Sequence, residues 1–201
     1  MKQKYKERMK KWKNLVIDSD KIKELFSDYN PKNPATVHEP SSQLAKEFYW
    51  MALKDPTYKK VVLTAGGGWS GKSEVLVSGI PKDSATLVFD WTWKNFDKIV
   101  SQYDQAIQAG KEAEISAVYI DYRTAKKFNE KRERNVPEEV LEDTHKGYRK
   151  TLLRIAKERP DIKISLTENL WTRDEFGNAV VNRVPNEDII EFLSKVQEIE
   201  A

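Results

Sequence analysis

The residues with the clearest capacity for chemistry occupy positions 66–73, in the order Gly66-Gly67-Gly68-Trp69-Ser70-Gly71-Lys72-Ser73. This segment has the spacing of one glycine, four residues and then Gly-Lys-Ser. Glycines let a backbone curl until successive N–H groups face one anion, and a helix after the loop adds its positive end. The lysine of such a motif reaches the outer phosphates of a nucleotide, and the serine hydroxyl is placed to ligate Mg²⁺. We therefore predict that residues 66–73, here called the phosphate loop, bind ATP or GTP with Mg²⁺, with Ser73 on the metal.

The sequence on either side of the phosphate loop supplies the context that this motif requires. Residues 60–64 form a compact β-branched run typical of a buried parallel strand, and residues 72–78 fit a helix. Glu74 follows the loop at once and is included in the predicted nucleotide site. Trp69 is unusual inside such a loop, where it either stacks on a base or covers the loop. The alternative to a nucleotide site is a glycine-rich turn that binds nothing.

Three acids follow segments that we expect to be strands: Asp20, Asp90 and Asp121. Reacting groups gather at the carboxyl ends of the strands in an open parallel sheet. A kinase needs a carboxylate that orients and deprotonates the acceptor hydroxyl, so Asp20 and Asp90 are candidates for that base. Asp121 after residues 118–120 either resembles the second acidic motif of P-loop ATPases, which holds Mg²⁺, or caps the next helix.

A basic stretch lies between residues 124 and 134 and could cover a migrating phosphoryl group. Its cations are Lys126, Lys127, Lys131, Arg132 and Arg134. One interpretation is a lid that delivers positive charge to the phosphates. The other is an ordinary charged helix in solvent.

Strand-like and helix-like patterns alternate along the chain. Strands are predicted at residues 14–17, 60–64, 85–89, 115–120 and 162–166, with a hairpin turn at Gly177. Helices are predicted at residues 21–26, from Ser41 or Ser42 to Leu53, at 72–78, at 96–109, from Pro137 to residue 155, and at 186–199. In the helix at 96–109, Ile107 is expected to face inward. This alternation predicts one domain, residues 1–201, with a three-layer α/β fold and a mainly parallel sheet of about five strands.

Composition excludes several classes of site. The chain has no cysteine, which removes disulfides, thiolate catalysis and Cys-based metal centres, and its two histidines are too few for a histidine centre. Both histidines are interpreted as polar packing groups. The net charge of +3 is too small to indicate nucleic-acid binding, and no apolar run is long enough to span a membrane, so a cytoplasmic protein is expected. Residues 1–13 are strongly basic and form either a solvated helix or an arm for anionic partners.

Four segments together resemble the zeta-toxin group of P-loop kinases. They are residues 64–73, residues 87–92 ending in Asp90-Trp91-Thr92, residues 132–147 from Arg132 to Gly147, and residues 17–42 with Val37-His38-Glu39-Pro40-Ser41-Ser42. In the founding toxins, the stretch like residues 17–42 follows the phosphate loop, so this chain looks circularly rearranged relative to them. The rearrangement is sterically plausible, because a strand can keep its place in a sheet while its connections change.

The resemblance implies roles for individual residues. Asp20 would be the general base, Lys72 and Ser73 would contact phosphate and Mg²⁺, and Arg132 or Arg134 would lie on the phosphates. Asp90 and Thr92 would lie near the acceptor, and Lys94 is assigned to the same acceptor site. The best-known acceptor in the group is UDP-N-acetylglucosamine, and a toxin of the group is held by a small antitoxin protein.

The sequence supports three hypotheses from different classes. The first is an ATP-dependent kinase that phosphorylates a hydroxyl of a small molecule. The second is an ATPase or switch module that uses Asp121 on Mg²⁺. The third is a nucleic-acid end kinase, which draws on the basic segment at residues 1–13 although nucleic acid is not the expected partner.

Overall fold

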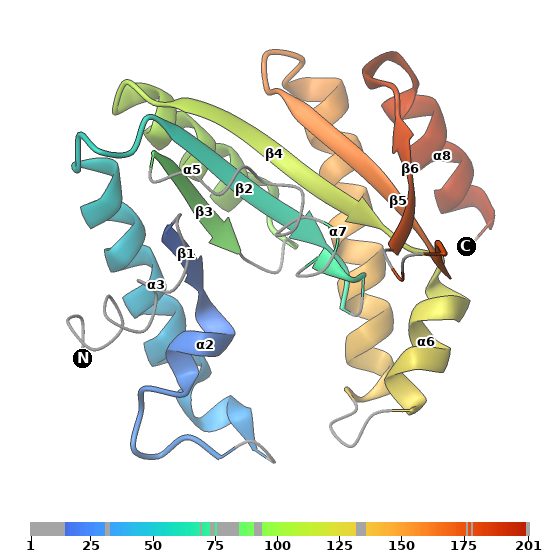
Figure 1. Ribbon diagram of the computed structural model, residues 1–201, viewed down its shortest axis with the longest axis horizontal. Helices are drawn as coiled ribbons and strands as arrows, with labels where there is room; N and C mark the ends of the chain where they lie inside the picture. The colour runs from blue at the N-terminus through green and yellow to red at the C-terminus, as the bar shows by residue number, and fades with distance from the viewer. Residues whose placement is uncertain are drawn as a thin grey trace. The chain divides into compact units, whose positions relative to one another are not determined.

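The computed structural model describes residues 15–30, 33–68, 70–72, 75, 85–90, 94–131, 136–175, 177 and 179–199. Two compact units make up the chain. Figure 1 labels its helices and strands and colours them along the sequence. The first consists of Met1–Leu63, Pro81–Trp91 and Gln105–Ala113, and the second of Thr64–Ile80, Thr92–Asp104 and Glu114–Ala201. The basic segment at residues 1–13 lies outside the described residues.

Two parallel strands form the sheet portion of the first unit. They are β1 (Leu15–Asp18) and β3 (Thr86–Asp90), and their register pairs Ile17 with Phe89 and Asp18 with Asp90. β3 is buried almost throughout, as its apolar composition predicts. The strands predicted at 14–17 and 85–89 are thus confirmed within one residue, and both end in an acid.

The helices of the first unit are α2 (Ser19–Lys23) and α3 (His38–Leu53), with a 3₁₀ turn, η1 (Pro34–Val37), before α3. α2 and α3 pack together, and Tyr49 of α3 lies 4.7 Å from Phe89 of β3 between ring centroids. The prediction that Ser41 or Ser42 caps α3 is wrong. The helix begins at His38, and the Ser41 hydroxyl donates to the His38 carbonyl inside it. Pro40 is tolerated because its missing N–H falls in the first turn, where N–H groups have no partner in the helix.

The second unit contains β4 (Glu112–Tyr119, which begins in the first unit), β5 (Ile164–Arg173) and β6 (Ala179–Val184). β4 and β5 are parallel, and β5 and β6 form an antiparallel hairpin around Gly177, whose φ is 81°. The predicted hairpin turn is confirmed. The strand predicted at 162–166 is too short, because β5 runs on into the hairpin.

With β2 (Lys60–Gly66), the strands form a six-stranded, mostly parallel sheet in the order β1-β3-β2-β4-β5-β6. The α/β fold with a mainly parallel sheet is confirmed. Within the described part of the chain the sheet has six strands rather than about five, since β6 adds an antiparallel edge.

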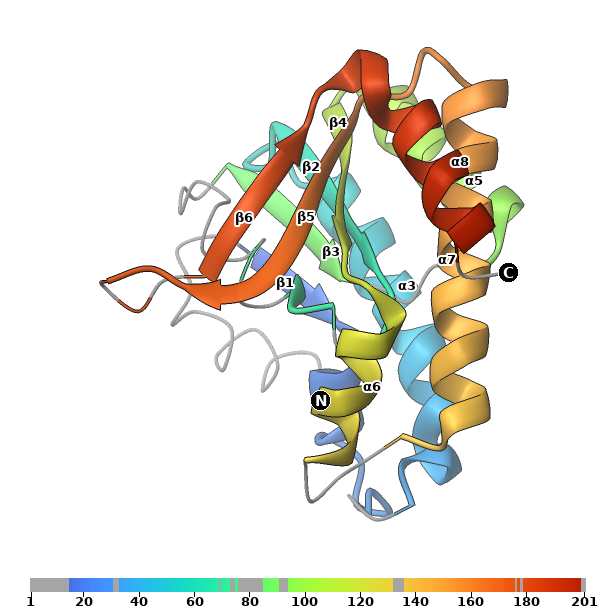
Figure 2. The same ribbon diagram turned by 90° about the vertical axis from the view of Figure 1, so that its right-hand side faces the viewer.

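Three further helices were predicted and are observed: α5 (Phe96–Gln108), α7 (Glu138–Glu158) and α8 (Ile189–Ile199). α6 (Tyr122–Glu130) was not among the predicted helices, and it holds the first part of the basic stretch. α7 follows Pro137 as expected, and α8 follows a 3₁₀ turn, η2 (Asn186–Asp188). α8 packs against α7 (Figure 2). Ile107, expected to face inward, is 49% exposed, because it lies in the last turn of α5 beside Gly110. None of the helices within the described part of the chain is long and apolar enough to cross a membrane.

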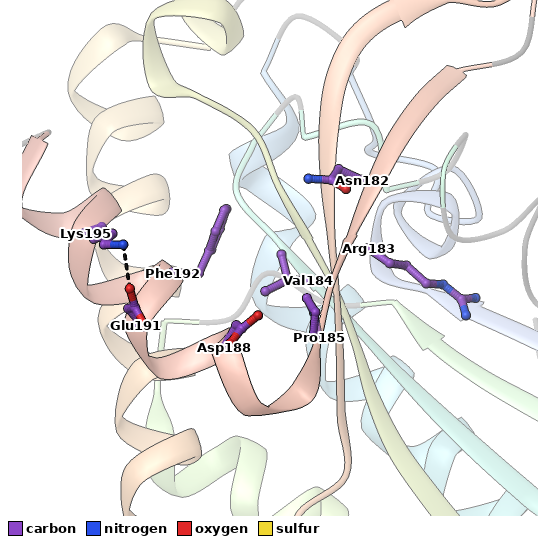
Figure 3. Close-up of a pocket in the computed structure, with 8 residues that line it drawn as sticks. All are labelled: Asn182, Arg183, Val184, Pro185, Asp188, Glu191, Phe192 and Lys195. Carbon is purple, nitrogen blue, oxygen red and sulfur yellow. Dashed lines mark hydrogen bonds and ion pairs between the residues drawn. The ribbon is translucent and has the colours of Figure 1, made fainter.

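A pocket of about 310 Å³ lies between β6 and α8 (Figure 3). Its lining is mostly polar and includes Arg183, Asp188 and Phe192. Glu191 and Lys195 at its rim form an ion pair one helical turn apart. None of the described residues of the phosphate loop lines this pocket.

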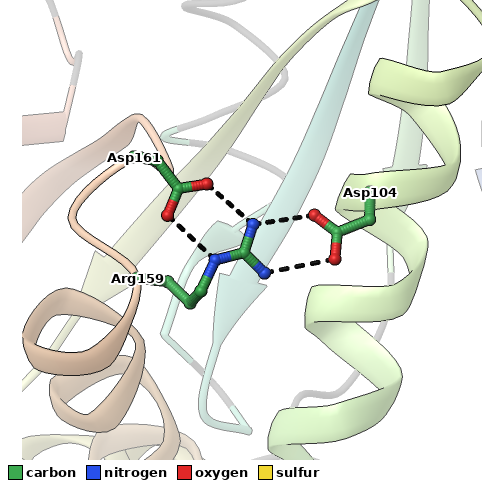
Figure 4. A network of polar contacts seen from close by, with 3 residues as sticks. All are labelled: Asp104, Arg159 and Asp161. Carbon is green, nitrogen blue, oxygen red and sulfur yellow. Dashed lines mark hydrogen bonds and ion pairs between the residues drawn. The ribbon is translucent and has the colours of Figure 1, made fainter.

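The end of α7 is fixed by one arginine (Figure 4). The Arg159 guanidinium donates to both carboxylate oxygens of Asp104 in α5, at 2.8 and 3.1 Å, and to both oxygens of Asp161, at 2.7 and 2.8 Å. These charge-assisted bonds raise the pKa of Arg159. They tie the C-terminal end of α7 to α5 with bidentate geometry.

Candidate functional site

The structure describes part of the predicted nucleotide and acceptor residues. The described members are Asp20, Gly66, Gly67, Gly68, Ser70, Gly71, Lys72, Asp90 and Lys94. The others lie outside the described residues: Trp69, Ser73, Glu74, Thr92, Arg132 and Arg134. The described members divide between the two units. Asp20 and Asp90 belong to the first unit, and the described residues of Gly66–Lys72 together with Lys94 belong to the second.

The phosphate loop has the strand and the helical turn that its motif requires. β2 ends at Gly66, and within the loop the Ser70 N–H donates to the Gly67 carbonyl at 3.3 Å. Lys72, near the end of the loop, and Val75 beyond it are helical, and the Val75 N–H donates to the Gly71 carbonyl at 2.8 Å. Gly71 has a φ of +79°, a conformation that glycine adopts without strain. The chain therefore turns sharply between a buried strand and a helical turn.

One side of the loop rests on α7 through His145. The His145 ring is 1% exposed, and its Nε2 lies 2.6 Å from the Gly68 carbonyl oxygen. Burial lowers the pKa of His145 to about 4, so the ring is neutral at physiological pH. Because a carbonyl only accepts, Nε2 carries the proton and donates it. Nδ1 is then an acceptor, and it is buried without a partner among the described residues.

The other side of the loop is held by Asn169, near the end of β5. Its Nδ2 donates to the Ser70 carbonyl at 3.1 Å, and the side chain is buried. A Cβ at Gly71 would lie 2.6 Å from the same Nδ2. Asn169 and His145 therefore bind two carbonyls of the loop, those of Ser70 and Gly68, from two different elements.

Two loop glycines are required by space rather than by φ. A Cβ at Gly67 would lie 2.8 Å from three atoms of the His145 ring, and one at Gly66 would lie 2.5 Å from the Ser70 hydroxyl and 2.9 Å from Cγ of Lys72. Contacts under 3.0 Å force a neighbour to move. The loop is thus a close-fitted backbone cradle, which suits the approach of phosphate to N–H groups.

A buried arginine lies close to His145 on α7. Arg149, one turn further along α7, is buried and donates from Nε to the His145 carbonyl at 3.1 Å. Burial lowers the pKa of Arg149, yet a guanidinium stays protonated at physiological pH. Tyr122 meets the His145 ring edge-on, with centroids 5.7 Å apart. α7 thus carries a buried cation one turn from the histidine that contacts the loop.

Asp121 lies two residues beyond the end of β4 and caps α6. Its Oδ2 accepts from the Thr124 N–H at 2.9 Å and from the Thr124 hydroxyl at 3.0 Å. The capping role predicted for Asp121 is confirmed. Its second carboxylate oxygen is the one left for the Mg²⁺ role that the ATPase hypothesis requires. The described residues hold no cluster of three or more His, Asp or Glu side chains that could bind a metal.

In the first unit, the structure distinguishes the acids around residue 20. The Asp20 side chain is 70% exposed and pairs with Lys23 at 2.7 Å. Asp18, the last residue of β1, is in register with Asp90 and is 16% exposed. Burial and then the neighbouring Asp90 charge raise the pKa of Asp18, while its Oδ1 accepts from the Asp20 N–H at 2.8 Å. Asp18 and Asp90 therefore lie side by side at the ends of adjacent parallel strands, whereas Asp20 does not belong to this pair.

The basic stretch begins on α6 and is closed by a buried amide. The Asn129 side chain donates to the Val136 carbonyl and accepts from the Val136 N–H, both at 2.7 Å. Lys126 pairs with Glu138, and Lys131 Nζ lies 5.6 Å from the Phe128 ring centroid. Asn129 thus joins the two ends of the segment that contains Arg132 and Arg134.

Lys94, assigned to the acceptor, lies against α7. Its ammonium pairs with Asp143, and its backbone carbonyl accepts from the Thr151 hydroxyl at 3.2 Å. The Gly147 Cα faces the Lys94 side chain, since a Cβ there would lie 3.2 Å from its Cγ.

His145 and Asn169 are the residues whose contribution the sequence did not reveal. His145 was interpreted as a packing group, and Asn169 was not singled out. The available signal for Asn169 was its place at the carboxyl end of a buried run, where ligand sites form in parallel sheets. His145 offered no local signal, because its partner in the loop is 77 positions away.

Comparison with known proteins shows a likeness of fold. The chain is similar to a solved structure, the crystal structure of the AvrRxo1-ORF1:-ORF2 complex, with a TM-score of 0.50 and 11% sequence identity. The likeness covers 85% of this chain and 74% of that chain. No protein-family model matches the sequence, and no curated protein matches it. At 11% identity, the similarity concerns the fold alone.

Proposed function

We propose that this protein is an ATP-dependent phosphotransferase that moves the γ-phosphate to a hydroxyl of a small molecule. The observation that carries the proposal is the close-fitted phosphate loop, with Lys72 at the start of a helical turn and two carbonyls held by His145 and Asn169. Binding of those carbonyls from outside supports a curled backbone of the kind that turns N–H groups towards an anion. The glycines at 66, 67 and 71 fit such a cradle, since any side chain there would meet a neighbour.

The nucleotide and metal would be held by the residues of the motif. Lys72 would contact the outer phosphates, and the Ser73 hydroxyl would ligate Mg²⁺. Mg²⁺ supplies charge neutralisation and orientation of the phosphates. Trp69, Glu74, Arg132 and Arg134 complete the proposed nucleotide site.

The base that activates the acceptor is proposed among the acids at the ends of β1 and β3. The acceptor oxygen forms a bond to the γ-phosphorus, the bond from that phosphorus to the β,γ-bridging oxygen breaks, and the hydroxyl proton passes to a carboxylate. Asp18 suits this role better than Asp20, because burial and Asp90 raise its pKa against the opposing effect of Lys21, whereas Asp20 is exposed and paired with Lys23. Asp90, Thr92 and Lys94 are proposed at the acceptor.

The acceptor class and the partner rest on the resemblance to the zeta-toxin group. A nucleotide sugar such as UDP-N-acetylglucosamine is the first acceptor to test, and a small antitoxin protein is the proposed partner. The similar fold in the AvrRxo1-ORF1:-ORF2 complex, which contains two different chains, is consistent with a protein partner.

The experiment is γ-phosphate transfer from ATP with Mg²⁺ into a pool of nucleotide sugars, nucleosides, aminoglycosides and short oligonucleotides, read by mass spectrometry. One acceptor that gains a single phosphate, and gains none with Lys72→Ala, supports the proposal. Phosphate released to water at a rate that no acceptor changes would refute it in favour of the ATPase, with Asp121 as the next residue to substitute. A phosphorylated oligonucleotide would favour the end kinase.

A further inference from the structure

Trp171 in β5 has an unusual backbone. Among the described residues other than glycine, it alone has a positive φ, at 53°. The register of the β5–β6 hairpin shifts between Asn169 and Arg173, so Trp171 lies in an irregular stretch of the strand. A bulky residue rarely adopts this conformation, and it persists where the surrounding structure holds it, often at ligand sites.

The contact that holds Trp171 also contacts the phosphate loop. The Trp171 N–H donates to Asn169 Oδ1 at 3.0 Å, and Nδ2 of the same amide donates to the Ser70 carbonyl at 3.1 Å. One buried side chain therefore fixes both the indole-bearing residue and the loop. Trp171 and the loop are placed relative to each other by two hydrogen bonds.

The indole ring lies against a second aromatic ring. Trp171 stacks on Phe128 of α6 with centroids 4.1 Å apart and planes 19° apart, and both side chains are only half-buried. The indole Nε1–H is covered and has no acceptor among the described residues. A covered donor without an acceptor costs free energy, which a ligand atom or water would recover.

Packing alone accounts for part of this arrangement. A stacked pair buries apolar surface, and a bulge accounts for the register shift. Neither explains why a half-exposed indole stands at the carboxyl end of a parallel strand, tied by one amide to a loop with the phosphate motif. A nucleotide explains both, because its phosphates and its planar base are parts of one ligand.

We propose that Trp171, backed by Phe128, is the surface on which the base of the bound nucleotide stacks. The inference rests on the proposed function, because it takes the phosphates of that nucleotide to occupy the loop. Stacking accepts any base, since every base has a π-face. We therefore expect ATP and GTP to bind with affinities that differ by less than about tenfold, in keeping with stacking rather than hydrogen-bond recognition.

The test compares ligands with and without a base. Dissociation constants for ATP, GTP and inorganic tripolyphosphate, each with Mg²⁺, would be measured by calorimetry for the wild type, Trp171→Ala, Trp171→Phe and the control Trp50→Ala. Trp50 is 51% exposed on α3 and belongs to the other unit. Trp171→Ala should weaken ATP and GTP about 5- to 100-fold, leave tripolyphosphate within about twofold, and be largely rescued by Trp171→Phe.

The outcomes separate the inference from the proposed function. Equal loss for tripolyphosphate would mean that the ring supports the loop, and no loss for ATP would mean that the base lies elsewhere; either overturns the inference alone. A wild type that binds neither ATP nor tripolyphosphate would overturn the proposed function and the inference with it. If Trp171→Ala does not fold, quenching of indole fluorescence tests the inference instead. ATP should quench the fluorescence of the wild type more than that of Trp171→Phe, and tripolyphosphate should quench neither protein. Equal quenching of the two proteins by ATP would overturn the inference.

Discussion

Substituting Gly67 by alanine tests the fitted loop directly. The added Cβ would lie 2.8 Å from Cδ2, Cε1 and Nε2 of His145, where optimal carbon contacts are about 3.5–4.0 Å. The φ of Gly67 is not positive, so the cost comes from this contact and not from backbone strain. The ring cannot withdraw easily, since it is buried and bonded to Gly68. The loop must therefore shift.

The size of the effect follows from the rigidity of the site. Overpacking a fitted interior costs roughly 1–3 kcal/mol. Because about 1.4 kcal/mol is a tenfold change in affinity, Gly67→Ala should weaken ATP binding by about 5- to 150-fold. His145→Ala also weakens binding, through a lost hydrogen bond and a cavity. The double variant should nevertheless bind ATP no worse than His145→Ala alone, because the ring that the methyl group meets is gone.

The assay is calorimetric titration of ATP with Mg²⁺ into the four proteins of the cycle, with circular dichroism to confirm folding. Gly147→Ala is the matched control, because its Cβ would meet only the flexible stem of Lys94 at 3.2 Å. That control should bind ATP normally and gain about 0.5–1 kcal/mol of stability from a better helix residue. Normal ATP binding by Gly67→Ala, or additive losses in the double variant, would refute the argument that His145 fits against the loop.

Three further predictions concern the acids, the histidine and the α7 clamp. Asp18→Asn should lower the rate of transfer by about 10²- to 10⁴-fold with little change in ATP affinity. The same change should raise the thermal midpoint near pH 7, because the fold disfavours the charged form of Asp18. A larger rate loss in Asp20→Asn would contradict this assignment. The free energy of unfolding should fall by up to roughly 3 kcal/mol as pH drops from 6.5 towards 4, because His145 gains its proton at a higher pH in the unfolded chain than in the fold. Denaturation of His145→Gln should show a weaker dependence of stability on pH. An unchanged dependence would place the His145 ring in a wetter environment. Arg159→Ala should lower the thermal midpoint by about 2–4 °C, because this side chain is only 26% exposed and bonds two carboxylates. The control Lys195→Ala removes an ion pair in solvent and should change the midpoint little. Equal effects of the two substitutions would show that the bidentate contacts have no special role.

The parts of the fold set by local chemistry were predictable. β1, β2 and β3 are short apolar runs, and Gly177 needs its positive φ, so their positions follow from residue type. The start of α3 did not follow, because two serines imitate a cap while Pro40 in the first turn marks the true beginning. The sixth strand was missed although its turn was recognised, since a half-exposed edge strand has a weak pattern.

The candidate site was predictable only where one segment builds it. The glycines of the phosphate loop are constrained by the loop itself, and a motif records that constraint. The carbonyl contacts of the loop come from residues 77 and 99 positions away, and no local pattern reveals such a pairing. Asp20 was chosen from the family resemblance, and the sequence did not show that β1 ends at Asp18 while Asp20 lies in the first turn of α2, since strand and helix ends are uncertain by a residue or two.

The Asn129–Val136 contact has a consequence for the junction between α6 and α7. One buried amide supplies both a donor and an acceptor to the same residue, Val136, which lies just before Pro137 and the start of α7. The last turn of α6 and the residue that leads into α7 are therefore held together by two hydrogen bonds from a side chain that carries no charge. Because a buried polar group that loses its partner costs free energy, a change at Asn129 acts on both helices at once.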